Sequence, residues 1–177
     1  MTLVEEINET PVSSEYEEII FDLPGPWKGQ NWNYCKFTKS DGTEWYGVFR
    51  EKFESNLLIC DLPEKGIALI VSGGHGYLID IDRKIKMKDL ETEPILDSYV
   101  DKISNTFYIS RWWDCKYIGI DLKENEIEIP IDCDGIYFKE RQGQKLKLEL
   151  NEIGTDLKKS YDFYIDLNDN KIKKKAV

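Results

Sequence analysis

The sequence lacks the residue patterns of several common functional classes. It has a single histidine, His75, and its four cysteines at positions 35, 60, 115 and 133 form no Cys-x-x-Cys pair. A structural zinc site usually needs such close pairs, because each of two turns then supplies two ligands. The phosphate-binding patterns GxxxxGK[ST] and GxGxxG and the nucleophile motif GxSxG are also missing. We therefore expect no metal and no cofactor, and we do not expect an enzyme.

Long apolar runs are missing too. No stretch is long enough to span a bilayer, and the first ten residues, MTLVEEINET, lack the basic and apolar regions of a signal peptide. We expect a cytoplasmic protein without a membrane partner. In a reducing compartment the four thiols should be free and buried as small apolar side chains.

Positive charge is absent from the first part of the chain. The net charge is −10, and residues 1–26 hold seven acidic residues but no Lys or Arg. Such a protein repels nucleic acid and anionic membranes and attracts basic partners. Residues 1–14 are also poor in apolar side chains, so we expect a mobile acidic arm there. Three of its carboxylates are candidate contacts for a basic partner, namely Glu5, Glu6 and Glu9.

Aromatic residues and short alternating runs are plentiful. The aromatic share is 12%, with five Trp and ten Tyr, and such side chains fit pleated strands. Residues 32–51 indicate a hairpin around Asp41-Gly42, and residues 56–62 and 66–72 are short apolar runs separated by a turn signal. These patterns therefore predict that residues 15–177 form a single, mainly β domain. Its antiparallel meander would form a curved sheet, a sandwich or a partial propeller-like barrel.

One segment breaks the β pattern. In TEPILDSYVDKIS the apolar residues fall at helical spacing, with Thr92 placed as an N-cap and Pro94 in the first turn. We predict one amphipathic helix near residues 93–104, and a loop with scattered anchors is the alternative. The apolar face would be formed by Ile95, Leu96, Tyr99, Val100 and Ile103.

An internal echo relates distant parts of the chain. IDLKENEI at 120–127 matches IDLNDNKI at 165–172, and each should use its Asn, Asn125 or Asn170, as the left-handed turn residue. A related arrangement occurs in IALIVSGGHGYLIDIDRKI, where Ser72 takes the place of Ser110 at a strand end. The loops that follow these serines would protrude from one sheet edge, so His75 would neighbour the loop RWWD.

The two tryptophans of that loop are the most informative residues for function. Adjacent residues of a strand point to opposite faces, so we expect one of Trp112 and Trp113 in the core and the other on the rim. Arg111 and Asp114 would lie on the rim beside it. The alternative is that both indoles pack within the domain, because tryptophan is buried on average.

Two short motifs offer alternative chemistry. His75 in SGGHG would act as a general base with Asp80, Asp82 or Asp114, although no nucleophile accompanies it and a glycine-rich hairpin turn explains the motif equally well. DCDG at 132–135 resembles the kernel of a calcium loop but lacks the further ligands in register. A β-turn with capping aspartates accounts for it.

Two resemblances follow from these residues. GIALIVSGGHGYLIDIDRK resembles one blade of a β-propeller repeat protein. In its acidity and β-rich character, with SGGHGYLIDID as the nearest sequence feature, the chain resembles small bacterial immunity proteins. That resemblance implies a toxin domain as the protein partner, for example a basic nuclease, whose active site the chain would cover. The alternatives are a small-molecule-sensing or accessory domain with GGHG and RWWD as its cleft, and an unrecognised enzyme using His75.

Overall fold

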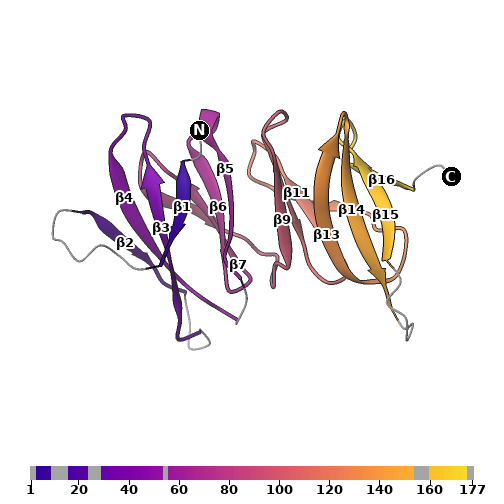
Figure 1. Cartoon of the computed structure of the whole chain (residues 1–177), viewed down its shortest axis with the longest axis horizontal. Helices are drawn as coiled ribbons and strands as arrows, with labels where there is room; N and C mark the ends of the chain where they lie inside the picture. The colour runs from indigo at the N-terminus through magenta and orange to yellow at the C-terminus, as the bar shows by residue number, and fades with distance from the viewer. Residues whose placement is uncertain (1–2, 9–15, 24–28, 54–55, 154–159, 175–177) are drawn as a thin grey trace. The chain divides into compact units, whose positions relative to one another are not determined.

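The protein is described by a computed structural model that covers residues 3–8, 16–23, 29–53, 56–153 and 160–174. The chain divides into two compact units, residues 1–94 and residues 95–177 (Figure 1). Each unit contains two four-stranded sheets. Where the sequence indicates one domain over residues 15–177, the buried side chains gather in two separate clusters. The amino-acid composition of the chain does not reveal this division into two units.

The first unit pairs a mixed sheet with a meander. Its first sheet has the order β1-β3-β4-β2, in which β2 lies parallel to β4 and the other pairs are antiparallel. Its second sheet runs β5-β6-β7-β8 in chain order and is antiparallel throughout. A short 3-10 helix, Pro63–Lys65, connects β5 and β6. The strands are β1 (Val4–Ile7), β2 (Glu18–Phe21), β3 (Trp32–Thr38), β4 (Glu44–Arg50), β5 (Leu58–Leu62), β6 (Ile67–Ser72), β7 (His75–Asp80) and β8 (Ile85–Asp89).

The core of the first unit lies between its two sheets. Trp45 is fully buried, stacks on Phe37 with ring centroids 4.1 Å apart, and donates its indole N–H to the carbonyl of Ile81 at 3.0 Å. Ile70 and Ile79 enter the same cluster from β6 and β7. The two sheets therefore form a sandwich, as the alternating sequence predicts.

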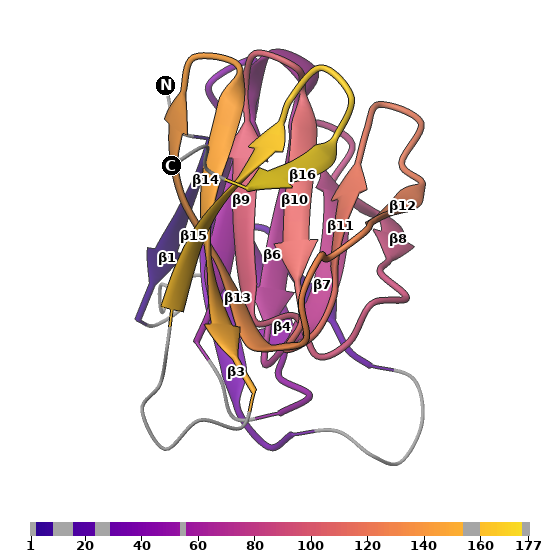
Figure 2. The same ribbon diagram turned by 90° about the vertical axis from the view of Figure 1, so that its right-hand side faces the viewer.

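The second unit consists of two antiparallel meanders. Their strand orders are β12-β11-β10-β9 and β13-β14-β15-β16, and Figure 2 turns the second of these sheets toward the viewer. Leu146, Leu148 and Leu150 of β14 form the centre of the buried cluster, and Tyr108 of β10 joins it. The strands are β9 (Asp97–Asp101), β10 (Thr106–Ser110), β11 (Cys115–Ile118), β12 (Glu124–Ile127), β13 (Cys133–Gln142), β14 (Lys145–Glu152), β15 (Ser160–Asp166) and β16 (Lys171–Lys174).

The predicted mainly β fold is confirmed, and none of the four sheets closes into a barrel over the described residues. The predicted helix near 93–104 is wrong. Asp97–Asp101 forms β9, which pairs with β10 in an antiparallel hairpin, and Ile103 lies 75% exposed in the turn. Helical spacing of apolar residues also fits a short strand followed by a turn, and pairing with β10 decides between them.

The predicted acidic arm also needs correction. Val4–Ile7 pairs with β3, and Val4 is only 2% exposed. The carboxylate of Asp61 accepts the backbone N–H of Leu3 at 2.6 Å and fixes the start of this strand. Residues 4–7 therefore have an ordered place in the sheet. The rest of the predicted arm, residues 1–2 and 9–14, lies outside the described residues.

The internal echo corresponds to a repeated turn. In three hairpins a strand ends in Asp, four turn residues follow, and the fourth adopts positive φ: Asp80 to Lys84, Asp101 to Asn105 and Asp166 to Asn170. In each case the Asp side chain accepts a backbone N–H of its own turn. The prediction for Asn170 is confirmed, whereas Asn125 lies inside β12 and Leu122 takes the positive φ in that hairpin.

No helix among the described residues has the length and apolar character needed to cross a membrane.

Candidate protein-binding surface

The β10–β11 hairpin places two tryptophans at its tip. Ser110 pairs with Cys115, and the backbone N–H of Arg111 donates to the carbonyl of Asp114 at 2.8 Å. Trp112 and Trp113 therefore form the two-residue tip of the hairpin. The four residues Arg111, Trp112, Trp113 and Asp114 are here called the Trp turn. The two indoles are 39% and 58% exposed. The expectation that one of them belongs to the core is wrong, because the strand ends before them and its alternation no longer applies.

Contacts with the start of β13 hold the Trp turn in place. The carbonyl of Trp112 accepts the N–H of Gly135 at 2.6 Å and lies 3.7 Å from the sulfur of Cys133. Gly135 has φ +132°, and a Cβ at this position would come within 3.0 Å of the ring of Tyr137. The positive φ and the crowding by Tyr137 therefore both favour glycine at this position, where the backbone N–H is held by the turn.

Arg111 positions the exposed indole of Trp113. Its guanidinium is bound to the carboxylate of Asp114, with Nε donating to Oδ1 at 2.8 Å. Its central carbon lies 5.4 Å from the ring centroid of Trp113, within the range of a cation–π contact. The hydrogen bonds to Asp114 raise the pKa of Arg111, so the guanidinium stays charged. The exposed ring thus has a fixed neighbour rather than only water.

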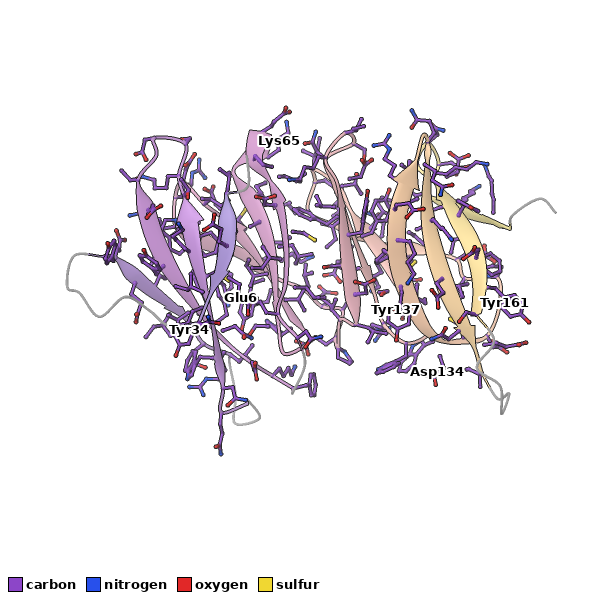
Figure 3. The ribbon with its side chains drawn as sticks, viewed as in Figure 1. Glu6, Tyr34, Lys65, Asp134, Tyr137 and Tyr161 are labelled. Carbon is purple, nitrogen blue, oxygen red and sulfur yellow. The ribbon has the colours of Figure 1, made fainter. Side chains whose placement is uncertain are left out.

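More aromatic and acidic residues lie next to the turn. Asp132 and Asp134 are exposed on either side of Cys133, and Tyr137 follows on the same strand (Figure 3). Cys133 pairs with Glu152 across the sheet, and Glu152 accepts the hydroxyl of Tyr161 at 3.2 Å. The Trp turn therefore borders a surface that is both aromatic and acidic.

His75 does not lie on an exposed rim. It is 5% exposed at the start of β7, directly after the turn residues Gly73 and Gly74, whose φ values are +54° and +73°. The alternative reading of GGHG as a glycine-dependent hairpin turn is therefore confirmed. His75 belongs to the first unit and the Trp turn to the second.

Both ring nitrogens of His75 face carboxylates. Nδ1 contacts Glu93, and Nε2 lies 3.0 Å from Oδ1 of Asp89. Burial raises the pKa of Asp89, but the hydrogen bonds from Lys86 and His75 outweigh it and bring the pKa below its ordinary value. Glu93 also pairs with Lys52. A general base needs a free ring nitrogen, and this arrangement leaves His75 none, so the contacts describe a structural charge cluster.

The partners that the sequence suggested for His75 have other roles. Asp80 accepts the N–H of Arg83 at 2.9 Å, and Asp82 accepts the N–H of Ser40 at 2.8 Å. Asp114 is paired with Arg111. Asp89 and Glu93 were not among the predicted partners of His75, because Glu93 lies in the segment predicted as a helix and no local motif marks either residue.

The acidic residues near the N-terminus lie on β1. Glu5 is exposed and pairs with Lys36 at 3.2 Å, and Glu6 is exposed beside it (Figure 3). Glu9 lies outside the described residues. Both Glu5 and Glu6 belong to the first unit, whereas the Trp turn belongs to the second.

DCDG belongs to the beginning of β13 rather than to a metal-binding loop. Cys133 and Gly135 are buried strand residues, and Asp132 and Asp134 point their charge to solvent. Within the described ranges no group of three or more His, Cys, Asp or Glu side chains is arranged to hold a metal ion. The four cysteines are free and buried.

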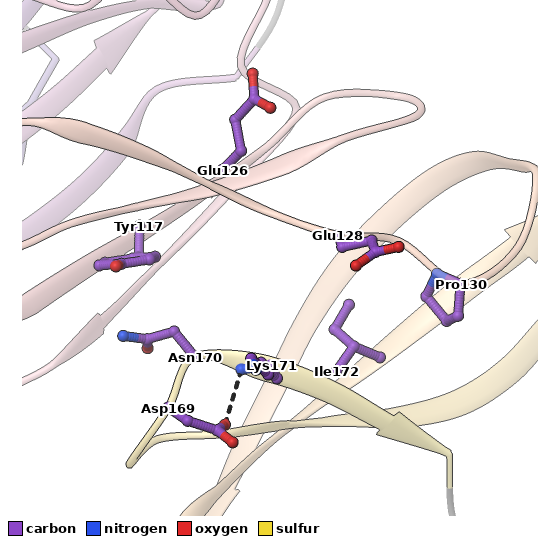
Figure 4. A pocket seen from close by; sticks show the side chains of 8 residues that line it. All are labelled: Tyr117, Glu126, Glu128, Pro130, Asp169, Asn170, Lys171 and Ile172. Atoms are coloured by element: carbon purple, nitrogen blue, oxygen red, sulfur yellow. Dashed lines mark hydrogen bonds between the residues drawn. The ribbon is translucent and has the colours of Figure 1, made fainter.

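A surface hollow of about 520 Å³ lies elsewhere in the second unit (Figure 4). Two of its polar side chains are bound within the fold: Asn170 accepts the hydroxyl of Tyr108 at 2.7 Å, and Asp169 accepts the N–H of Lys171 at 3.0 Å. None of its lining residues is among the candidate site residues predicted from the sequence. The hollow is lined by Tyr117, Glu126, Glu128, Pro130, Asp169, Asn170, Lys171 and Ile172.

The Trp turn is therefore the predicted site that the structure leaves most exposed: two adjacent aromatic side chains lie at a hairpin tip rather than in a core. A comparison of the chain with protein-family models and with curated proteins finds no match to either.

Proposed function

We propose that the protein is a cytoplasmic protein-binding module that acts as an inhibitor. In the form suggested by the resemblance to immunity proteins, it neutralises a bacterial toxin domain by covering its active site. The observation that carries the proposal is the pair of adjacent, exposed indoles at the tip of the β10–β11 hairpin. Tryptophan is among the residues that most often anchor protein interfaces.

The geometry of the turn supports an anchoring role. Exposed indoles contribute little to the stability of the unit, so their apolar surface needs another explanation. The hydrogen bond from Gly135 and the Arg111–Asp114 pair fix the turn before any partner arrives. A partner that binds a fixed side chain loses less conformational entropy than one that must order it.

Quantitative affinity capture tests the proposal. The bait is the full chain, compared with a Trp112→Ala, Trp113→Ala double variant and with a control, Ile103→Ala, which removes an exposed apolar side chain from the tip of the neighbouring β9–β10 hairpin. A protein partner should be retained by the wild type and the control and lost by the double variant. The enzymatic or growth-inhibiting activity of that partner should then be blocked by the wild-type chain and not by the double tryptophan variant.

Two results would argue against this function. A partner captured equally by the wild type and the double variant would show that the Trp turn is not the contact. A partner whose activity is unaffected by a saturating amount of the chain would show binding without inhibition, and the inhibitor role would fall.

A further inference from the structure

The surface beside the Trp turn carries negative charge that the described part of the fold does not neutralise. Asp132 and Asp134 are exposed, and neither forms an ion pair with a described residue. They flank Cys133, whose sulfur contacts the carbonyl of Trp112 at 3.7 Å. Two carboxylates are thus attached to the backbone segment that supports the exposed indoles.

A third carboxylate and another exposed aromatic ring extend this surface. Glu152 lies opposite Cys133 in the β13–β14 ladder, and its only described partner is the hydroxyl of Tyr161, at 3.2 Å. Tyr161 is 37% exposed. Asn151 accepts the hydroxyl of Ser160 at 2.8 Å and so ties β14 to β15 at the same end. The Trp turn, the start of β13, the end of β14 and the start of β15 therefore lie at the same end of the second unit.

Several carboxylates of the second unit have a lysine beside them. Glu149 pairs with Lys139 at 3.0 Å, Asp162 pairs with Lys147 at 3.0 Å, and Asp166 pairs with Lys173 at 2.7 Å. Arg111, the cation within the Trp turn, is held by Asp114. The carboxylates at positions 132, 134 and 152 form no ion pair with a described residue, so this surface keeps a negative charge.

The nearby carboxylates affect the pKa of the Cys133 thiol. Burial is the main reason that its pKa is raised, and the carboxylates of Asp132, Asp134 and Asp114 raise it further against the opposing N–H of Gly135. A negative charge that disfavours a thiolate favours a cation brought to the same place. The local field and the exposed indoles therefore suit one kind of side chain, because guanidinium groups both stack on indoles and pair with carboxylates.

We infer that the surface formed by the Trp turn with Asp132, Asp134, Glu152 and Tyr161 docks a protein whose contact face carries arginine and lysine side chains. This inference rests on the proposed function and names the chemistry of the partner at that same site. The indoles would hold the partner after contact, and the carboxylates would accelerate its approach and select against acidic proteins.

A defined probe makes this testable before any natural partner is known. The probe is a library of disulfide-looped random peptides displayed on phage and selected on the full chain. A counter-selection on the Trp112→Ala, Trp113→Ala variant removes peptides that bind elsewhere. Peptides that depend on the Trp turn should be enriched in Arg and Lys relative to the unselected library.

A second pair of variants measures the role of charge directly. Asp132→Asn with Asp134→Asn should weaken the Trp-dependent peptides about tenfold at low salt, with the difference shrinking as the ionic strength rises. The matched control is Asp121→Asn with Glu140→Gln, two exposed carboxylates at the opposite ends of the β11 and β13 regions. The control should bind as the wild type does, and urea unfolding of all the variants checks that each is folded.

The outcomes separate the two proposals. If no peptide distinguishes the wild type from the double tryptophan variant, the proposed binding function fails and this inference fails with it. If Trp-dependent peptides are recovered but are not enriched in basic residues, or bind the Asp132→Asn, Asp134→Asn variant as tightly as the wild type, the binding function stands and the basic partner is refuted.

Discussion

At the scale of single residues, the chain uses tryptophan in two opposite ways. Trp45 is enclosed by the core of the first unit, where its ring stacks on Phe37 and its N–H has a carbonyl partner. Trp112 and Trp113 project from a turn, where they are 39% and 58% exposed, and the guanidinium of Arg111 lies against the ring of Trp113. The same side chain therefore contributes mainly to folding at one position and is available for binding at the other.

Unfolding measurements should reveal this difference. Trp112→Ala and Trp113→Ala should each change the free energy of unfolding by about 1 kcal/mol or less, since they remove surface contacts and one cation–π contact. Trp45→Ala should cost about 3–5 kcal/mol, as expected for a large cavity in a core. Urea titration followed by circular dichroism measures all three. A loss at Trp112 or Trp113 as large as that at Trp45 would place the turn in the core.

Two aspartates of the second unit should titrate at different pH values. The ammonium of Lys173 and the amide groups of Asn168 lower the pKa of Asp166 from 3.8 to about 2. Burial raises the pKa of Asp97 despite two backbone N–H donors. The ion pair of Asp166 therefore stabilises the fold above its ordinary pKa and is lost as the pH falls toward 2, whereas the native state holds a proton on Asp97 more tightly than the unfolded chain does.

Carboxyl-detected NMR titration checks both directions. Asp166 should show a midpoint near 2, and Asp97 should show one above 3.8. Lys173→Ala should move the Asp166 midpoint upward, because it removes the main hydrogen-bond donor, and should leave Asp97 unchanged. Equal midpoints for the two aspartates in the wild type would contradict the assignment.

At the scale of elements, three side-chain bridges fasten the two sheets of the second unit to each other. Asp97 of β9 accepts the N–H of Phe138 in β13 at 2.7 Å, and Ser110 of β10 donates to the carbonyl of Ile136 at 2.7 Å. Farther along, Asp101 of β9 pairs with Arg141 of β13. β13 is an edge strand of its sheet, so its backbone groups on the side away from β14 are available for such contacts.

Removing the cation of the third bridge should be costly. Arg141→Met leaves the carboxylate of Asp101, which is 2% exposed, without its counter-charge, and should lower the free energy of unfolding by about 3 kcal/mol. Lys139→Met is the matched control, because it breaks a more exposed pair with Glu149 on the same strand and should cost less than about 1 kcal/mol. Denaturant unfolding that shows equally small losses would mean that the bridge does not fasten the sheets.

Local sequence patterns predicted some of these elements and not others. The hairpin at Asp41-Gly42 and the strands on either side of residues 63–66 follow from turn residues and apolar runs, and both are observed. Residues 93–104 were predicted as a helix because a short apolar run fits either period, and its partner strand is not visible locally. The sequence predicted that the Trp turn protrudes from a sheet edge. It did not predict that both indoles are exposed, because that depends on the residue at which β10 ends. The contacts of His75 with Glu93 and Asp89 could not be predicted, because no sequence motif links these three positions.

At the scale of the whole molecule, the four cysteines are divided evenly between the units. Cys35 and Cys60 lie in the first unit, and Cys115 and Cys133 lie in the second. All four are buried, and burial raises the pKa values of Cys35, Cys115 and Cys133. Because the thiolate is the reactive form, both effects protect these residues in the native state.

Thiol labelling in increasing urea should therefore follow the unfolding of each unit. The native protein should react slowly with iodoacetamide at neutral pH, and all four thiols should react once the chain is unfolded. Mass spectrometry of the labelled peptides assigns each modification to residues 1–94 or to residues 95–177. Rapid labelling of any of the four cysteines in the native protein would contradict the burial described above.

The order of the strands has a consequence for how the chain folds during its synthesis. Among the described strands, each sheet takes all of its members from one stretch of the chain, within residues 4–50, 58–89, 97–127 and 133–174. Most ladders join strands that are adjacent in the chain, so they need only short loop closures and should form quickly. A ribosome would release the sheets one after another, and the first unit has both halves of its core once residue 89 has emerged. The N-terminal half can therefore complete its own core while the strands that carry the Trp turn are still being made.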